Sequence, residues 1–164
     1  MRLMKGFNRN NGELFLDDIL LSDLAASYGT PTYVYSASLI RSRFFEYKDA
    51  LRQDDKVCFA VKSNSNINIL KLLNEMGSGF DVVSGNELRR CLLAGADPKN
   101  IVFSGVGKTK AEIQLALKEN IFSINIESEN ELNRIIEIAK EMGVEANCAI
   151  RVNPDISAES HPYI

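Results

Sequence analysis

The feature that most constrains the fold of this chain is a repeat of about 22 residues, in which a short apolar run is followed by a helical pattern. In the helical parts, apolar residues recur every three or four positions, which is the spacing of an amphipathic helix. Short strands that alternate with helices predict a parallel sheet covered by those helices. The predicted strands are Val57–Val61, Gly79–Val83, Ile101–Ser104, Phe122–Ile126 and Ala146–Val152.

Signals for helix ends accompany this repeat. Ser84 with Glu87, and Ser128 with Glu131, have the spacing of capping boxes that open a helix directly after a strand. Glycines suited to a left-handed C-cap follow three helical runs, at Gly77, Gly95 and Gly143.

Two architectures could hold such a sheet. An open doubly wound sheet would carry a glycine-rich phosphate fingerprint after its first strand, but VCFAV is followed by KSNSN. The even length of the units instead favours a (β/α)8 TIM barrel, which takes about 250 residues when complete. We therefore expect an α/β fold with about five βα units of an incomplete barrel, so that the sequence is the front part of a larger protein.

The segment before the repeat has a different pattern. Asn11–Gly12 predicts a tight turn between two short strands, and helices are expected at Leu21–Tyr28 and Ser38–Leu51, joined through an extended stretch at Pro31–Tyr35. We expect residues 1–36 to form an N-terminal segment that pairs with a β-domain outside this chain, and residues 37–164 to form the partial barrel domain.

Composition excludes several classes of protein. The formal net charge is −3, the pI is about 5.3, and acidic and basic residues are interspersed, which argues against nucleic acid or an anionic membrane as partner. No apolar run approaches the length of about 20 residues that spans a membrane, and the N-terminus lacks the apolar core of a signal peptide. We expect a cytoplasmic protein.

The cysteines and the single histidine do not indicate a metal site. Cys58, Cys91 and Cys148 are widely spaced and form no CxxC pair, so we expect no bound metal and no disulfide framework. We interpret all three as small buried apolar residues. Gly105–Thr109 ends like a phosphate-binding P-loop, but Val102 stands where that motif requires its first glycine, so we interpret the segment as a barrel turn.

The strongest candidate for chemistry is Lys62, which directly follows the predicted strand Val57–Val61. Barrel enzymes keep their active sites at the C-terminal ends of the strands. A lysine amine in suitable surroundings can form a Schiff base with an aldehyde cofactor such as pyridoxal phosphate. The alternative is an ordinary surface lysine at a strand end.

Several ordered motifs resemble one enzyme family. The chain is similar, from about Gly12 to its last residue, to the fold-type III (alanine-racemase-like) pyridoxal-phosphate decarboxylases. The motifs that carry the resemblance are Tyr28–Ser36 (YGTPTYVYS), Phe59–Asn64 (FAVKSN), Gly79–Leu88 (GFDVVSGNEL), Arg151–Pro154 (RVNP) and His161–Ile164 (HPYI).

The resemblance implies roles for several residues. Lys62 would hold pyridoxal 5'-phosphate covalently and act in catalysis, with Asp81 beside it and Arg151 near the cofactor ring. The alternatives are a strand-end carboxylate that caps a loop for Asp81 and a structural ion pair for Arg151. Glu87 is explained by its capping position. His161 lies in a loop that resembles a substrate-side loop, and we assign it no chemical role.

The resemblance also implies an activity. We expect a pyridoxal-phosphate-dependent amino-acid decarboxylase that acts on a small-molecule amino acid, with meso-diaminopimelate as substrate and L-lysine as product, and a homodimer in the complete protein. A relative that acts on ornithine, arginine or carboxynorspermidine, a racemase, and a truncated non-catalytic module are the alternatives. The remaining residues of the family's cofactor site would lie beyond Ile164.

Overall fold

The computed structural model describes residues 6–154, which form two compact units. The first unit extends to Val57 and includes Glu75–Gly77, and the second contains Cys58–Asn74 and continues from Ser78. Within the described residues, no helix is both long and apolar enough to cross a membrane.

The first unit opens with a small antiparallel sheet. Strands β1 (Phe7–Asn10) and β2 (Glu13–Leu16) form the predicted hairpin, and the φ angles of Asn11 and Gly12 are 50° and 85°. Positive φ at both central positions is the backbone of the tight turns that match strand twist. Strand β3 (Ile19–Leu20) pairs with β2 and was not predicted, because two residues carry no readable alternation.

Two helices follow in the first unit. Helix α1 (Leu21–Tyr28) has the predicted bounds, and α2 (Ala37–Lys48) begins one residue before and ends three residues before the predicted helix. The hydroxyls of Ser38 and Ser36 both donate to the carboxylate of Asp17, over 2.6 and 2.7 Å. These hydrogen bonds favour the ionised carboxylate and therefore lower the pKa of Asp17. The bond from Ser38 has the larger effect, followed by the bond from Ser36.

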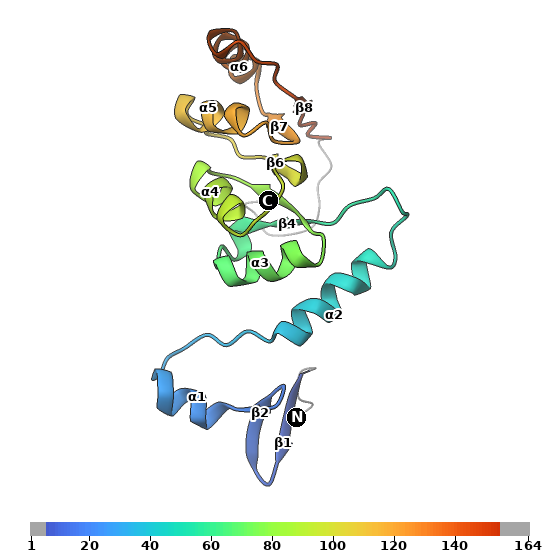
Figure 1. The fold of residues 1–164 in the computed structure, drawn as a ribbon, viewed down its shortest axis with the longest axis vertical. Coiled ribbons are helices and arrows are strands. Elements are labelled where there is room, and N and C mark those ends of the chain that lie inside the picture. The colour runs from blue at the N-terminus through green and yellow to red at the C-terminus, as the bar shows by residue number, and fades with distance from the viewer. Residues whose placement is uncertain (1–5, 155–164) are drawn as a thin grey trace. The chain divides into compact units, whose positions relative to one another are not determined.

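The second unit is built on a five-stranded parallel sheet in the order β4-β5-β6-β7-β8. All five strands were predicted. A strict sequential order with right-handed crossovers places every connecting helix on the same face, and in Figure 1 α4, α5 and α6 follow one another along one side of the strands. The order has no reversal of the kind that defines a doubly wound sheet, so the barrel architecture is confirmed. The elements are β4 (Cys58–Ala60), the 3-10 turn η1 (Val61–Ser63), α3 (Ile67–Glu75), β5 (Gly79–Val82), α4 (Gly85–Leu93), the 3-10 turn η2 (Pro98–Asn100), β6 (Ile101–Phe103), α5 (Lys110–Lys118), β7 (Ser123–Ile126), α6 (Glu129–Met142) and β8 (Cys148–Ile150).

The core of this unit lies between the sheet and its helices. The three inner strands direct their apolar side chains toward the helices, and the helices present one apolar stripe in return. Side chains on the opposite face of the same strands are more polar, because neighbours along a strand point to opposite faces. The buried core therefore includes Phe80, Val82, Ile101, Phe103, Ile124 and Ile126 from the strands and Leu70, Leu88, Ile113 and Ile135 from the helices.

The predicted helix ends are confirmed, with one difference in detail. Gly77, Gly95 and Gly143 have φ angles of 86°, 87° and 66°. The hydroxyls of Ser84 and Ser128 accept hydrogen bonds from the third residue of their helices as predicted.

The capping boxes predicted at Ser84 and Ser128 are incomplete, because their glutamates bind one residue further back. Glu87 accepts from the N–H of Val83, and Glu131 accepts from the N–H of Glu127, both over 2.8 Å. The reciprocal box instead occurs at α5, between Thr109 and Glu112.

The interpretation of the cysteines is correct for Cys91 and wrong for the other two. Cys91 is buried, and burial followed by the negative charge of Glu87 raises the pKa of its thiol to about 12. Cys58 and Cys148 are exposed. They begin β4 and β8, the two strands at the edges of the described sheet, where one side of the strand has no neighbour.

Candidate active site

A row of polar residues lies at the carboxyl ends of the five parallel strands, and each strand or the turn after it contributes one residue. Parallel strands bring their carboxyl ends to the same edge of the sheet, which is where barrel enzymes place their chemistry. In strand order, the row consists of Lys62, Asp81, Ser104, Asn125 and Arg151.

Lys62 is presented on a well-defined turn. It lies in η1, between the fully buried Val61 and Ser63, whose hydroxyl donates to the carbonyl of Ala60 over 2.7 Å. The N–H of Asn64 closes the turn on the carbonyl of Val61 at 3.0 Å. The Lys62 side chain itself is exposed and makes no hydrogen bond or ion pair within residues 6–154. The backbone is thus fixed while the amine remains available.

Asp81 lies on the strand next to Lys62. Parallel pairing aligns Asp81 with Ala60, two residues before Lys62. The Oδ1 atom of Asp81 accepts a hydrogen bond of 2.6 Å from the hydroxyl of Ser104, which follows β6. The carboxylate therefore bonds to the side chain of the first residue after the adjacent strand, and its role beside a cofactor stays a prediction.

Two members of the row were not predicted. Ser104 joins Asp81 to Asn125, because its hydroxyl oxygen accepts from Nδ2 of Asn125 over 3.1 Å. The available signal was a polar residue at the end of one apolar run and another inside the next, IVFS and FSINI. That pattern marks a strand with one polar face, but it does not indicate which polar residues are in contact.

A buried ion pair bonds to one member of this row, Asn125. Lys108 and Glu131 are 4% and 8% exposed, and the Lys108 ammonium donates to Glu131 over 3.1 Å. The same ammonium donates to the carbonyls of Gly105 and Asn125, each over 2.7 Å. With all three protons bonded, Lys108 fastens the loop after β6 to β7. This agrees with the interpretation of Gly105–Thr109 as a barrel turn.

Arg151 closes the row at β8. Its guanidinium donates to both carboxylate oxygens of Glu127, over 3.0 and 3.2 Å, and its side chain is 59% exposed. The structural ion pair considered for Arg151 is therefore present, and its role near a cofactor stays a prediction. His161 lies outside the described residues.

Comparison with known proteins identifies the family to which these features correspond. Residues 37–164 match the family described as the pyridoxal binding domain of pyridoxal-dependent decarboxylases. The diaminopimelate decarboxylase of Pseudomonas aeruginosa is 48% identical over 162 residues, which is 98% of this chain and 39% of that protein. The diaminopimelate decarboxylase of Aquifex aeolicus is 45% identical over 168 residues, which is 100% of this chain and 40% of that protein.

Solved structures agree with these sequence matches. Diaminopimelate decarboxylase from Helicobacter pylori complexed with L-lysine has a TM-score of 0.84 and 46% identity, over 88% of this chain and 37% of that one. The enzyme of the same name from M. jannaschii has a TM-score of 0.90 and 38% identity, over 96% and 38%. An arginine decarboxylase from Paramecium bursaria Chlorella virus, at 19% identity and a TM-score of 0.69, shares the fold. The chain spans about two fifths of the length of its curated relatives.

Proposed function

The chain belongs to the pyridoxal-dependent decarboxylase family, and on this premise we propose that it forms the N-terminal part of an enzyme that decarboxylates meso-diaminopimelate to L-lysine. The observation that carries the proposal is Lys62, an exposed residue on a fixed turn at the carboxyl end of β4, the strand that pairs with the Asp81 strand β5.

The residues present fit pyridoxal 5'-phosphate as cofactor. The aldehyde of that cofactor requires one accessible amine, and Lys62 makes no hydrogen bond or ion pair in the part of the chain that the structure describes. A carboxylate and a guanidinium, from Asp81 and Arg151, stand on the same edge of the sheet and complement the charged groups of the cofactor. When bound, pyridoxal phosphate supplies the electron sink that takes up the electron pair left by departing carbon dioxide.

The protein's own contribution starts with Lys62. Its amine would hold the cofactor covalently, give way to the amine of the substrate, and displace the amine of the product at the end of the cycle. Asp81, on the strand next to Lys62, would keep the lysine side chain near the reacting groups. Arg151 adds positive charge at the opposite end of the row, with Glu127 holding its guanidinium in place.

Sequence identity supports the choice of substrate. The diaminopimelate decarboxylases of Pseudomonas aeruginosa and Aquifex aeolicus are 48% and 45% identical to this chain over nearly its whole length. The arginine decarboxylase and the lysine/ornithine decarboxylase complexed with putrescine are 19% and 18% identical. At this identity the two decarboxylases share only the fold with this chain. The higher identity to the diaminopimelate decarboxylases therefore favours meso-diaminopimelate over arginine and ornithine as substrate.

Assembly and location belong to the same proposal. We assign a homodimer to the complete protein and a cytoplasmic location, and we assign residues 1–36 to a segment that pairs with a second, C-terminal β-domain. The three-stranded sheet of β1, β2 and β3 gives that segment strands able to extend a larger sheet.

A substrate panel with the complete protein tests the proposal. We expect L-lysine and carbon dioxide from meso-diaminopimelate and no product from ornithine or arginine. Lys62→Ala should abolish L-lysine formation, because the substitution removes the amine proposed to bind the cofactor. Lys71→Ala, which removes an exposed amine from α3, is the matched control and should leave turnover unchanged. Turnover by the Lys62→Ala enzyme would overturn the proposal.

A further inference from the structure

Three polar side chains form a continuous hydrogen-bonded chain across β5, β6 and β7. The hydroxyl of Ser104 donates to Oδ1 of Asp81 over 2.6 Å, and Nδ2 of Asn125 donates to the hydroxyl oxygen of Ser104 over 3.1 Å. All three residues are half-buried. We refer to Asp81, Ser104 and Asn125 together as the polar ladder.

The polar ladder has a fixed direction. An amide NH2 group can only donate, so Asn125 leaves Ser104 to act as acceptor on that side and to direct its single proton at Asp81. Asp81 must then accept, which requires its Oδ1 to be unprotonated. Within the described residues, Oδ2 of Asp81 has no hydrogen bond, so this second oxygen remains available to a donor in the site.

The far end of the ladder is anchored independently. The backbone carbonyl of Asn125 accepts one of the three hydrogen bonds of the buried Lys108 ammonium, over 2.7 Å. Lys108 is held in turn by Glu131 on α6. The buried Lys108 thus fixes the position of Asn125. Through the hydrogen bonds of Ser104, Asn125 in turn restrains the carboxylate of Asp81.

A hydroxyl on this face of the sheet need not be bonded for the sheet to form. Ser123 lies on β7 two residues before Asn125 and points to the same face. Its hydroxyl is buried and has no hydrogen-bond partner within the described chain. Ser104, at the carboxyl ends of the strands where Lys62 stands, has both a donor and an acceptor partner, whereas Ser123 has neither within the described chain.

We propose that Ser104, held by Asn125, is a positioning residue that orients the carboxylate of Asp81 so that its second oxygen receives the amine of Lys62. The inference rests on the proposed function of Lys62. A lysine side chain has four rotatable bonds, and an oriented acceptor limits the region that its amine explores. The amine then meets the aldehyde of the cofactor in a reactive geometry more often.

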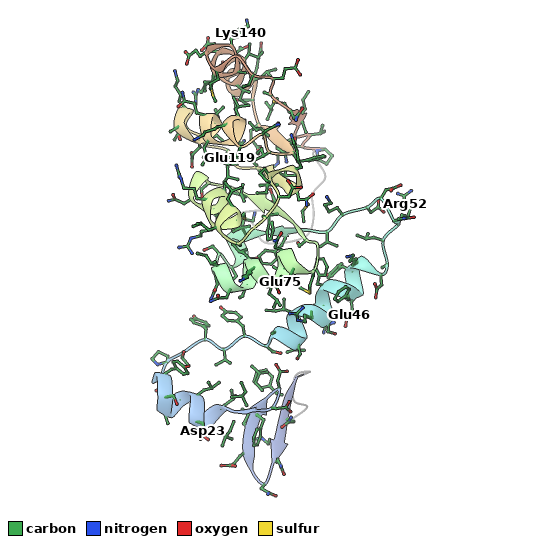
Figure 2. All side chains as sticks on the ribbon, viewed as in Figure 1. Asp23, Glu46, Arg52, Glu75, Glu119 and Lys140 are labelled. Carbon is green, nitrogen blue, oxygen red and sulfur yellow. The ribbon has the colours of Figure 1, made fainter. Side chains whose placement is uncertain are left out.

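The test measures how fast Lys62 captures pyridoxal phosphate in the complete protein after the cofactor has been removed. Samples are reduced with borohydride at successive times, and the modified lysines are identified by peptide mass spectrometry. We expect Ser104→Ala to slow capture at Lys62 about two- to tenfold, the range that corresponds to one net hydrogen bond. Lys140, exposed on α6 (Figure 2), provides the internal reference for nonspecific labelling.

Four further variants separate positioning from a structural effect. Ser104→Thr keeps the hydroxyl and should restore capture, and Ser123→Ala removes a hydroxyl outside the ladder and should leave capture unchanged. Asn125→Asp keeps the shape but removes the donor, so it should slow capture as Ser104→Ala does. In an Asp81→Ala background, Ser104→Ala should have no additional effect, because Ser104 acts through Asp81.

The outcomes distinguish this inference from the proposed function. If the unmodified protein is not labelled at Lys62, the proposed function fails. If it is labelled there, but Ser104→Ala and Asn125→Asp capture the cofactor as fast as Ser123→Ala, the ladder proposal alone is overturned. If Ser104→Ala fails to fold, as judged by circular dichroism, the isosteric Asn125→Asp variant decides.

Discussion

Lys62 and Lys108 both follow strand ends, but their surroundings give them opposite roles. Lys62 is exposed and makes no hydrogen bond within residues 6–154, whereas Lys108 is 4% exposed and donates three hydrogen bonds. An amine whose protons are all bonded in the interior cannot serve as a nucleophile without breaking those bonds. These surroundings support the proposed chemical role of Lys62 and show that Lys108 has a structural one.

At the residue scale, we predict that Lys108→Met strongly destabilises the complete protein. The substitution leaves the carboxylate of Glu131 buried and without its cation, which costs about 3–5 kcal/mol of unfolding free energy. Urea unfolding measures the loss. Lys110→Ala is the control, because its pair with Glu141 is 56% exposed on both sides and should contribute less than about 1 kcal/mol. Equal losses in the two variants would contradict a buried, structural Lys108.

At the scale of elements, Glu112 links two neighbouring helices. One oxygen of its carboxylate accepts from the N–H of Gly85 at the start of α4 over 2.7 Å, and the other completes the capping box of α5 with Thr109. The bond from Gly85, followed by that from the Thr109 backbone, lowers the pKa of Glu112 below its ordinary value of 4.5. The starts of α4 and α5 are thus joined by one charged side chain.

This link predicts a pH-dependent contribution to stability. A carboxyl group whose pKa is lowered by folding stabilises the protein at pH values above its unfolded pKa, and the contribution is lost as the pH falls through the folded pKa. We therefore expect Glu112→Gln to lower the thermal unfolding midpoint at pH 7, with a difference from the unmodified protein that narrows as the pH falls below 4.5. A difference that is the same at pH 7 and at low pH would show that the charge has no part in it.

The elements were largely predictable from the sequence, but the contacts that define the site were not. Hydrophobic periodicity and helix-capping signals are local patterns along the chain. For this reason α1, the five parallel strands and the left-handed glycines were predicted. Ser104 and Asn125 are 21 residues apart, and their contact with each other and with Asp81 arises from the register between strands. Cys58 and Cys148 are exposed because β4 and β8 lie at the edges of the described sheet. Strand order could not be read from the sequence pattern, so their exposure was not predicted.

At the scale of the whole molecule, the second unit is a five-stranded segment of barrel wall with its polar row along one edge. Its outer strands, β4 and β8, have one neighbour each among the described residues, and Ile150 on β8 is 77% exposed. A closed barrel has no such edges. This is consistent with the chain spanning about two fifths of its curated relatives, and it places the proposed activity in the complete protein.

The most direct test of the central claim is to identify which lysine of the complete protein carries pyridoxal phosphate. The purified holoenzyme is reduced with borohydride, digested, and sequenced by mass spectrometry. We predict one modified lysine, Lys62, because its amine stands unbonded at the carboxyl edge of the sheet. A cofactor attached to another lysine, with Lys62 unmodified, would contradict the account.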